Sequence, residues 1–75
     1  MEQQILAFFE QAYNRPAGSL SRETKIRDEL GGGSLLLVAV IANTEEEFDV
    51  TFPLAEASKC LTIGEFIDRV TELAE

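Results

Sequence analysis

Few side chains in this sequence could do chemistry, and the most conspicuous is a serine that follows a run of glycines. Ser34 comes directly after Gly31-Gly32-Gly33, and Leu35 then opens an apolar run. The glycines remove side-chain bulk around the hydroxyl. A helix that begins here would offer free N–H groups and about half a positive charge to an anion. Phosphate is the natural candidate for an anion attached to Ser34 or held beside it. The structural alternative is that Ser34 only caps a helix, because serine is among the best N-cap residues.

Independent catalysis is largely excluded by what the sequence lacks. The 75 residues include no histidine and a single cysteine, Cys60. They therefore cannot form a His-based triad, a Cys–His pair, an internal disulfide or a standard zinc site. The consecutive acids Glu45-Glu46-Glu47 would point about 100° apart on a helix and would not converge on one metal ion. We predict a protein that is not an enzyme, with no catalytic residue and no metal ligand.

The charge balance indicates the kind of partner. Six Lys and Arg against 14 Asp and Glu give a formal net charge of −8, which repels nucleic acid and anionic lipid at long range. It suits partners with basic patches, because complementary potentials speed encounter. No apolar run approaches the roughly 18 residues of a membrane span, and the chain does not open with a basic leader and a long apolar stretch. We expect a cytoplasmic monomer that binds other proteins.

Periodicity predicts an all-α domain. At this length the chain builds one core, and we expect one domain over residues 1–75. Four segments carry apolar residues at helical spacing or helix-start signals; they cover residues 3–14, 34–48, 53–58 and 62–74. The last begins with the capping box Thr62-Ile63-Gly64-Glu65, in which the threonine hydroxyl and the glutamate carboxylate each accept from a free backbone N–H. The sequence predicts a four-helix bundle with a short third helix.

A long connection over residues 15–33 separates the first two predicted helices. Pro16 lacks the N–H group that another helical turn would need, so it ends the first helix. Ile26 and Leu30, four residues apart, indicate one helical turn held against the core. A loop of this length in a compact domain is usually functional or partly structured.

The apolar run from Leu35 to Ala42 is unbroken, so periodicity alone does not decide between helix and strand. A strand here would pair with residues 48–52, which alternate. We favour a helix, because it places one set of residues on a single buried stripe: Leu37, Val40, Ile41, Thr44 and Phe48. Leu35, Leu36, Ala39 and Ala42 lie away from that stripe, and a domain this small cannot cover both faces. We expect an exposed apolar patch that binds a partner; the alternative is that residues 15–33 cover it.

The order of these features resembles the acyl carrier proteins. Leu30-Gly31 and Ser34-Leu35 match the family's attachment motif, and Glu45-Glu46-Glu47-Phe48-Asp49 matches the end of its second helix. The resemblance covers roughly residues 26–70 together with the first helix. It implies a four-helix bundle of acyl-carrier type in which Ser34 carries a covalent 4′-phosphopantetheine arm. Acyl groups would be attached to the thiol of that arm as thioesters, in fatty acid or polyketide biosynthesis. The implied partners are a phosphopantetheinyl transferase and acyl-transferring or condensing enzymes with basic or apolar docking patches.

Two departures from the family pattern leave alternatives open. Gly33 stands where the family usually has an aspartate that helps the transferase recognise the site, and Leu36 and Ala39 stand where the partner-binding helix commonly has acids. We expect a specialised carrier, and its partner-binding residues would be Leu35, Leu36, Ala39, Glu45, Glu46 and Glu47. The alternative is an unmodified module of the same fold that binds a partner, or a second copy of itself, through the apolar face of the helix.

Overall fold

Helices account for all the regular structure of the computed structural model, which describes residues 1–75. The elements, in chain order, are α1 (Glu2–Ala12), the π-helical turn η1 (Ile26–Leu30), α2 (Gly33–Phe48), α3 (Leu54–Ala57) and α4 (Ile63–Ala74). One isolated antiparallel bridge joins Lys25 to Thr62. The all-α prediction is confirmed, and the hairpin alternative for the apolar run is wrong, because the run lies inside α2.

The helix ends differ from the predicted ones by one or two residues, for local reasons. α1 stops at Ala12 instead of residue 14, because Asn14 adopts a φ of +54°, which does not continue a right-handed helix. Pro53 has an extended backbone and is the N-cap of α3, so the helix begins at Leu54 instead of residue 53. Thr62 is likewise the extended N-cap of α4. The turn predicted inside residues 15–33 is present as η1.

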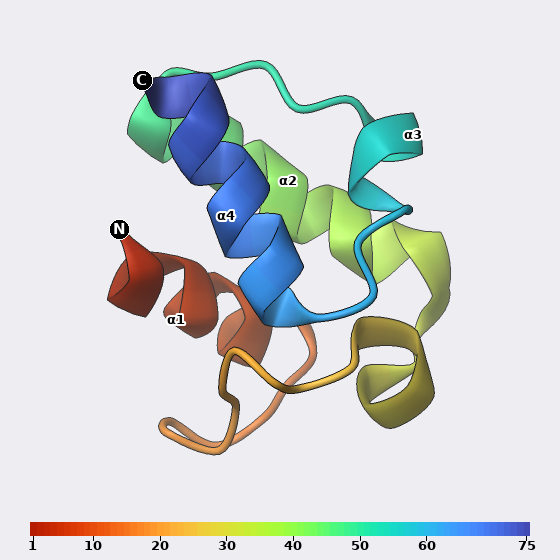
Figure 1. Ribbon diagram of the computed structural model, residues 1–75. Helices are drawn as coiled ribbons and strands as arrows, with labels where there is room; N and C mark the ends of the chain where they lie inside the picture. The colour runs from red at the N-terminus through yellow and green to blue at the C-terminus, as the bar shows by residue number, and fades with distance from the viewer.

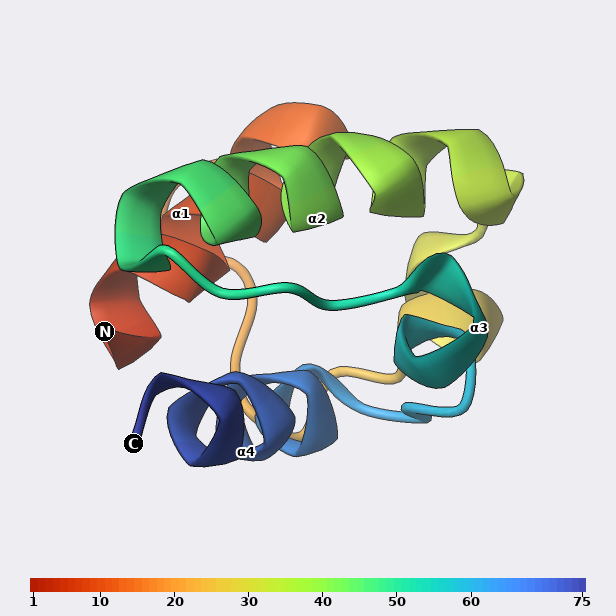
Figure 2. The same ribbon diagram turned by 90° about the horizontal axis from the view of Figure 1, so that it is seen from above.

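The helices form two layers, and α3 lies at one end of them (Figures 1 and 2). α1 packs against both α2 and α4, and α3 packs against α2. In the view of Figure 2, α1 and α2 lie side by side in one layer, and α4 lies in the other. Figures 1 and 2 both place α3 near the end at which α2 begins, and both termini near the end at which α2 finishes. None of these helices has the length and apolar character needed to cross a bilayer.

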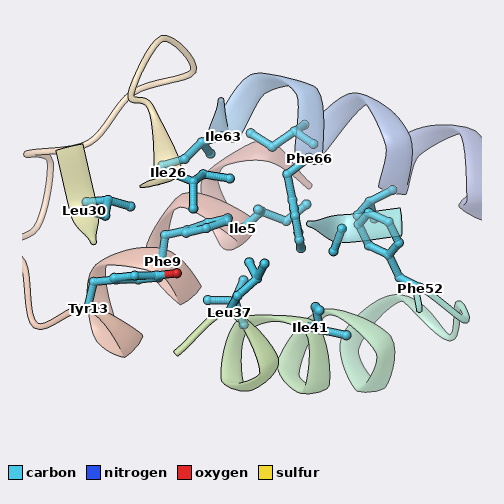
Figure 3. Packing of buried hydrophobic residues seen from close by; sticks show 14 residues of the cluster. Ile5, Phe9, Tyr13, Ile26, Leu30, Leu37, Ile41, Phe52, Ile63 and Phe66 are labelled. Carbon is cyan, nitrogen blue, oxygen red and sulfur yellow. The ribbon is translucent and has the colours of Figure 1, made fainter. Parts of the chain in front are cut away.

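The core is organised around three aromatic side chains from different parts of the chain (Figure 3). Phe66 on α4 meets Phe9 on α1 edge-on at 5.1 Å between ring centroids, and it meets Phe52, just before α3, at 4.9 Å. All three rings are fully buried. Because a buried phenylalanine side chain contributes roughly 1.5–3 kcal/mol, this cluster holds α1, α4 and the α2–α3 connection together.

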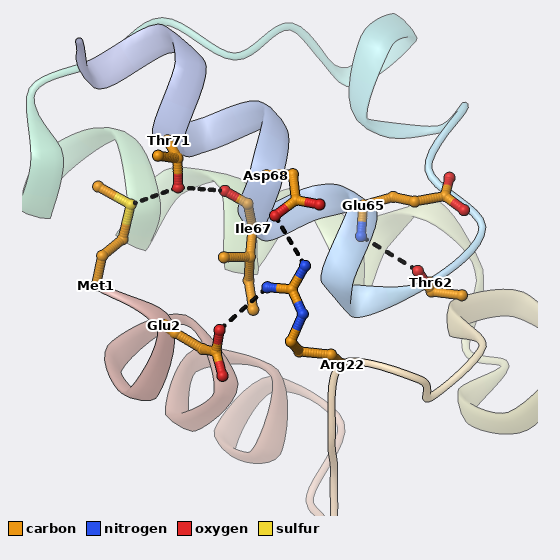
Figure 4. Close-up of polar contacts among 8 residues, drawn as sticks. All are labelled: Met1, Glu2, Arg22, Thr62, Glu65, Ile67, Asp68 and Thr71. Atoms are coloured by element: carbon orange, nitrogen blue, oxygen red, sulfur yellow. Dashed lines mark hydrogen bonds and ion pairs between the residues drawn. The ribbon is translucent and has the colours of Figure 1, made fainter.

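The connection between α1 and α2 is fixed to α4 through side-chain and backbone contacts. Arg22 donates to Asp68 Oδ1 at 2.8 Å and to Glu2 Oε1 at 3.0 Å (Figure 4). The Ile63 N–H donates to the Thr24 carbonyl at 3.0 Å. These contacts hold the segment that leads into η1, and η1 in turn leads into the start of α2.

Half of the predicted capping box is present as expected. Thr62 Oγ1 accepts from the Glu65 N–H at 3.2 Å (Figure 4). The Glu65 carboxylate accepts from the Leu61 N–H at 3.1 Å instead of the Thr62 N–H. The chain enters α4 through the extended residue Thr62, which is bridged to Lys25, and the carboxylate reaches the N–H one residue earlier.

Candidate functional site

Three successive glycines with positive φ lead into the candidate site. Gly31, Gly32 and Gly33 have φ values of +65°, +78° and +70°, a region that glycine enters without the steric cost a Cβ imposes. Gly32 is the N-cap of α2, and no side chain caps this helix. The interpretation of Ser34 as an N-cap is therefore wrong, and its hydroxyl is left for another role.

Ser34 lies in the first turn of α2 and is exposed. Its hydroxyl makes no hydrogen bond within the protein, whereas Ser19 donates to the Pro16 carbonyl at 2.6 Å and Ser58 donates to the Leu54 carbonyl at 2.8 Å. The hydroxyl of Ser21 is also without such a bond, but Ser21 lies in the connection before η1. Ser34 is thus the free serine hydroxyl at a helix start.

A cavity of about 380 Å³ opens beside Ser34. It lies between η1, the start of α2 and the chain after α3. Besides Ser34 and two of the glycines, its lining consists of Tyr13, Ile26, Arg27, Leu37, Ser58 and Cys60. A Cβ placed on Gly31 or Gly33 would meet no atom of a residue beyond its chain neighbours within 4 Å, so the space beside these two glycines is open.

These features fit a group attached through a phosphodiester. The hydroxyl supplies the attachment oxygen and is exposed. The first N–H groups of α2 have no partner within their own helix, and the positive end of the helix dipole favours a negative charge at that end. The adjacent glycines leave room for an approaching enzyme. Ser34 is therefore placed where a phosphate-linked arm could be attached and could extend over the cavity.

Cys60 also lines the cavity, and it is half-buried. Burial raises the pKa of its thiol, and the nearby Glu65 carboxylate acts in the same direction. Since the thiolate is the nucleophile, Cys60 is protonated and weakly reactive at neutral pH. The chain thus places no competing nucleophile of its own beside Ser34.

The outer face of α2 is apolar over its first half. Leu35 is 78% exposed and Val38 is 42% exposed; Ala39 and Ala42 are exposed as well. We name Leu35, Val38, Ala39 and Ala42 the α2 apolar face. The predicted patch did not include Val38, although Val38 lies three residues after Leu35 and so shares a face with it. Residues 15–33 do not cover Leu35.

Leu36 was also expected in the exposed patch, and here the structure differs. Leu36 is half-buried against the core, and its side chain occupies the space where a Cβ on Gly32 would stand. The absence of a side chain at Gly32 therefore lets Leu36 fold back toward Tyr13 and the core. This contact depends on the empty space at Gly32, which helical spacing does not reveal.

The three consecutive acids near the end of α2 have different surroundings. Glu45 Oε2 accepts from the Phe52 N–H at 2.7 Å and is partly buried. Glu47 Oε2 accepts from Gln4 Nε2 at 3.4 Å. Glu46 is exposed and makes no such contact. Glu45 thus tethers the α2–α3 connection, while the prediction that the three acids bind a partner stays a prediction. No three Cys, Asp or Glu side chains lie close enough together to hold a metal ion.

Comparisons with known proteins agree with this geometry. A family model described as a phosphopantetheine attachment site matches residues 3–70. Acyl carrier proteins from two Porphyromonas gingivalis strains, ATCC 33277 and W83, are each 29% identical to this chain over 70 residues. Those matches cover 93% of this chain and 90% of each relative.

A solved structure extends the comparison to three dimensions. The solution NMR structure of a holo acyl carrier protein from Geobacter metallireducens matches with a TM-score of 0.75 at 25% sequence identity. The match covers 96% of this chain and 83% of that chain. A free serine hydroxyl at the start of α2, the acyl-carrier fold and a family match over nearly the whole chain lead to one conclusion. This chain belongs to the acyl carrier protein family, whose covalent prosthetic group is 4′-phosphopantetheine.

Proposed function

We propose that this protein carries acyl groups as thioesters on a 4′-phosphopantetheine arm attached to Ser34, and that it presents them to partner enzymes in the cytoplasm without catalysis of its own. The observation that carries the proposal is the Ser34 hydroxyl, which is exposed, makes no hydrogen bond within the protein and borders an open cavity. Belonging to the acyl carrier family supports it.

The chain's own residues provide the attachment oxygen and favour the charge of the attached phosphodiester, and they do not attack the cargo. When attached, the arm supplies the terminal thiol on which an acyl group is held. Ser34 offers its oxygen to the transferase, and the first-turn N–H groups of α2 favour the negative charge of the resulting phosphodiester. The chain contains no histidine, and Cys60 keeps its proton, so neither general-base attack on a thioester nor transfer to Cys60 competes with delivery.

Presentation to partners would rest on α2. The α2 apolar face begins one residue after Ser34, so an enzyme that binds it also reaches the arm. Glu46 lies on the same side, seven residues after Ala39, which is two helical turns. We infer a partner surface with an apolar depression and a basic residue beside it. Tethering raises the local concentration of cargo to the mM scale, so weak docking is sufficient.

Intact mass measurement tests the attachment. The chain would be co-expressed with a phosphopantetheinyl transferase as the wild type, as Ser34→Ala and as Ser21→Ala, the second variant being the matched control at the other free serine hydroxyl. We expect one added 4′-phosphopantetheine on the wild type and on Ser21→Ala, and none on Ser34→Ala. Addition to Ser34→Ala would place the arm elsewhere.

An unmodified binding module of the same fold is the second candidate. Two observations favour it: Gly33 stands where the family usually has aspartate, and Leu35 exposes 78% of its surface beside the site. This candidate predicts no added mass on the wild-type chain even with excess transferase, together with binding of an apolar partner or self-association. The same mass spectra therefore separate the two functions.

A further inference from the structure

We propose that Tyr13 and Arg27 form an oxyanion-binding site in the cavity beside Ser34. Its ligand would be an oxyanion carried on Ser34, either the phosphodiester of the arm or a carboxylate on the cargo. The inference rests on the proposed function, in that Ser34 is the attachment point. It goes further by naming two donors on this chain and the charge of the group that they bind.

Tyr13 is the first part of the site. Only 7% of the residue is exposed, and its ring stacks on Phe9 at 5.9 Å between centroids with 17° between the planes. Figure 3 shows the ring beside Phe9, with the hydroxyl oxygen on the side of Leu37. Tyr13 and Leu37 both line the cavity.

The Tyr13 hydroxyl has no hydrogen-bond partner within the protein. No side-chain nitrogen or oxygen is completely buried without a partner, so this oxygen must keep access to open space. Tyr13 is one of the residues that line the cavity, and we infer that the hydroxyl reaches open space there. Burial raises the pKa of the phenol, which keeps the hydroxyl protonated and able to donate. The hydroxyl is therefore free to donate to water, or to an acceptor oxygen of a ligand bound in the cavity.

Arg27 supplies the positive charge. Its Nη2 donates to the Ser58 carbonyl at 3.0 Å, which leaves most of the guanidinium N–H groups free. No carboxylate lies within ion-pair distance of Arg27, whereas Arg22 and Arg69 are both paired with acids. Arg15 also lacks an acidic partner, but it donates to the carbonyls of Glu29 and Leu30 and does not line the cavity. Arg27 is thus the unpaired arginine that lines the cavity next to Ser34.

The backbone around Arg27 is held in place. Ile26 and Leu30, the first and last residues of η1, are buried. Arg15 Nη2 donates to the carbonyls of Glu29 and Leu30 at 3.3 and 3.4 Å. The Arg27 side chain therefore extends from a fixed turn and is not on a free loop, so a ligand in the cavity meets it at little cost in chain ordering.

The chemistry of the free groups defines the ligand. The Tyr13 hydroxyl and the free Arg27 N–H groups offer donors, and the Ser58 carbonyl already accepts from Arg27. A ligand that satisfies them must bring acceptor oxygens, and a negative charge strengthens each bond to the guanidinium. Phosphate and carboxylate both meet this requirement, and Ile26 and Leu37 provide apolar contact for the carbon atoms attached to them.

Nuclear magnetic resonance on isotope-labelled protein tests the proposal by following the Arg27 Nε–H and Tyr13 side-chain signals. Four forms would be compared: the unmodified chain, the chain with the bare arm, and the chain with a succinyl or a butyryl group on the arm. Succinyl and butyryl have the same number of carbon atoms and differ in the terminal carboxylate. Intact mass on each sample establishes how completely Ser34 is modified.

The two sources of oxyanion give different patterns. Movement of both signals on attachment of the bare arm assigns the phosphodiester as the ligand. Movement only with succinyl, and not with butyryl, assigns a cargo carboxylate. In either case Tyr13→Phe should abolish the Arg27 shift or reduce it severalfold, while Lys25→Gln, which removes a nearby exposed cation that does not line the cavity, should leave it unchanged. Fully modified chains in which neither signal moves in any form would overturn the proposal.

The site is also testable if Ser34 is not modified. The probe is then inorganic phosphate added to the unmodified chain. We expect saturable movement of both signals, weakened about tenfold in Arg27→Gln, which is the effect of one lost hydrogen bond to a charged group. Urea unfolding of Tyr13→Phe and Arg27→Gln establishes that each variant is folded. No saturable movement in the wild-type chain would overturn the oxyanion site, while an absent mass shift alone bears on the proposed function.

Discussion

At the scale of single residues, the glycines before Ser34 determine what the serine can do. Gly31, Gly32 and Gly33 all have positive φ, and the N-cap role that serine often takes is filled by Gly32. Positive φ also gives a physical reason for Gly33 at the position where the family usually has aspartate. A residue with a Cβ would be strained there, and alanine more so than aspartate.

This strain predicts the stability of Gly33 variants. Gly33→Ala should lower the free energy of unfolding by about 1 kcal/mol. Gly33→Asp should lose less, because aspartate tolerates positive φ better and its charge is favourable at a helix N-terminus. Urea unfolding followed by circular dichroism measures both. Gly18→Ala is the matched control, since Gly18 has a φ of +81° and equally open surroundings. A loss at Gly18 without one at Gly33 would contradict the explanation.

Cys60 gives a prediction on pH at the same scale. The pKa of the thiol is raised in the folded chain by burial and is ordinary, about 8.5, in the unfolded chain. The unfolded state therefore loses its proton first as pH rises, so the stability contributed by the protonated thiol is present below about pH 8.5 and lost above it. Urea unfolding over a pH series should show this decline in the wild type and a weaker one in Cys60→Ala. Equal declines would argue against a buried thiol.

At the scale of elements, α2 has two faces with different tasks. Leu37, Val40 and Ile41 are buried in the core, while the α2 apolar face is exposed beside Ser34. The acids at the end of the helix are likewise divided, since Glu45 holds the Phe52 N–H and Glu46 faces solvent. The same helix thus supports the fold and leaves an apolar face exposed, which we propose as the docking surface.

The docking role predicts a separation between binding and stability. Leu35→Gln should weaken binding to an acyl-transferring or condensing enzyme about tenfold or more, which corresponds to losing most of one buried leucine contact. It should change the free energy of unfolding by less than about 0.5 kcal/mol, because the side chain is exposed. Binding is measured by calorimetry or by surface plasmon resonance with the modified chain.

Leu61→Gln is the matched control for this prediction. Leu61 is 64% exposed but lies in the α3–α4 connection, away from the α2 apolar face. It should retain wild-type binding. Equal effects of the two substitutions would mean that general surface hydrophobicity, and not the α2 face, governs docking.

At the scale of the whole molecule, a small core supports four helices and a long connection. A chain of this length has an unfolding free energy of roughly 4–11 kcal/mol, and a few large side chains supply much of the burial. Phe66 contacts both Phe9 and Phe52, so it joins three segments that are far apart in the sequence.

Removing that central ring should destabilise the whole domain. We expect Phe66→Ala to lower the free energy of unfolding by about 3–5 kcal/mol, the usual cost of a buried phenylalanine, and to leave a substantial unfolded fraction. Phe8→Ala, at a half-buried phenylalanine on α1, should lose clearly less. Urea unfolding of both variants measures the difference. Similar losses would show that Phe66 has no special place in the core.

Much of the fold follows from local patterns. Helical spacing placed the four helices within one or two residues, because the periodicity of apolar side chains and the helix-start signals are properties of short segments. Residue types alone excluded a histidine-based catalyst. The glycine run with its serine indicates the candidate attachment site, and the family motif around it is a property of the sequence.

Tertiary structure decided which of these side chains are free. Glu45 bonds to Phe52 across a turn, Leu36 folds over Gly32, and Tyr13 meets Arg27 at one cavity although the two come from different elements. Helical spacing assigns a residue to a face, but the contacts on that face depend on segments far away in the chain. Which acid and which leucine of α2 are exposed, and which hydrogen-bond donors line the cavity, therefore depend on how those segments pack together.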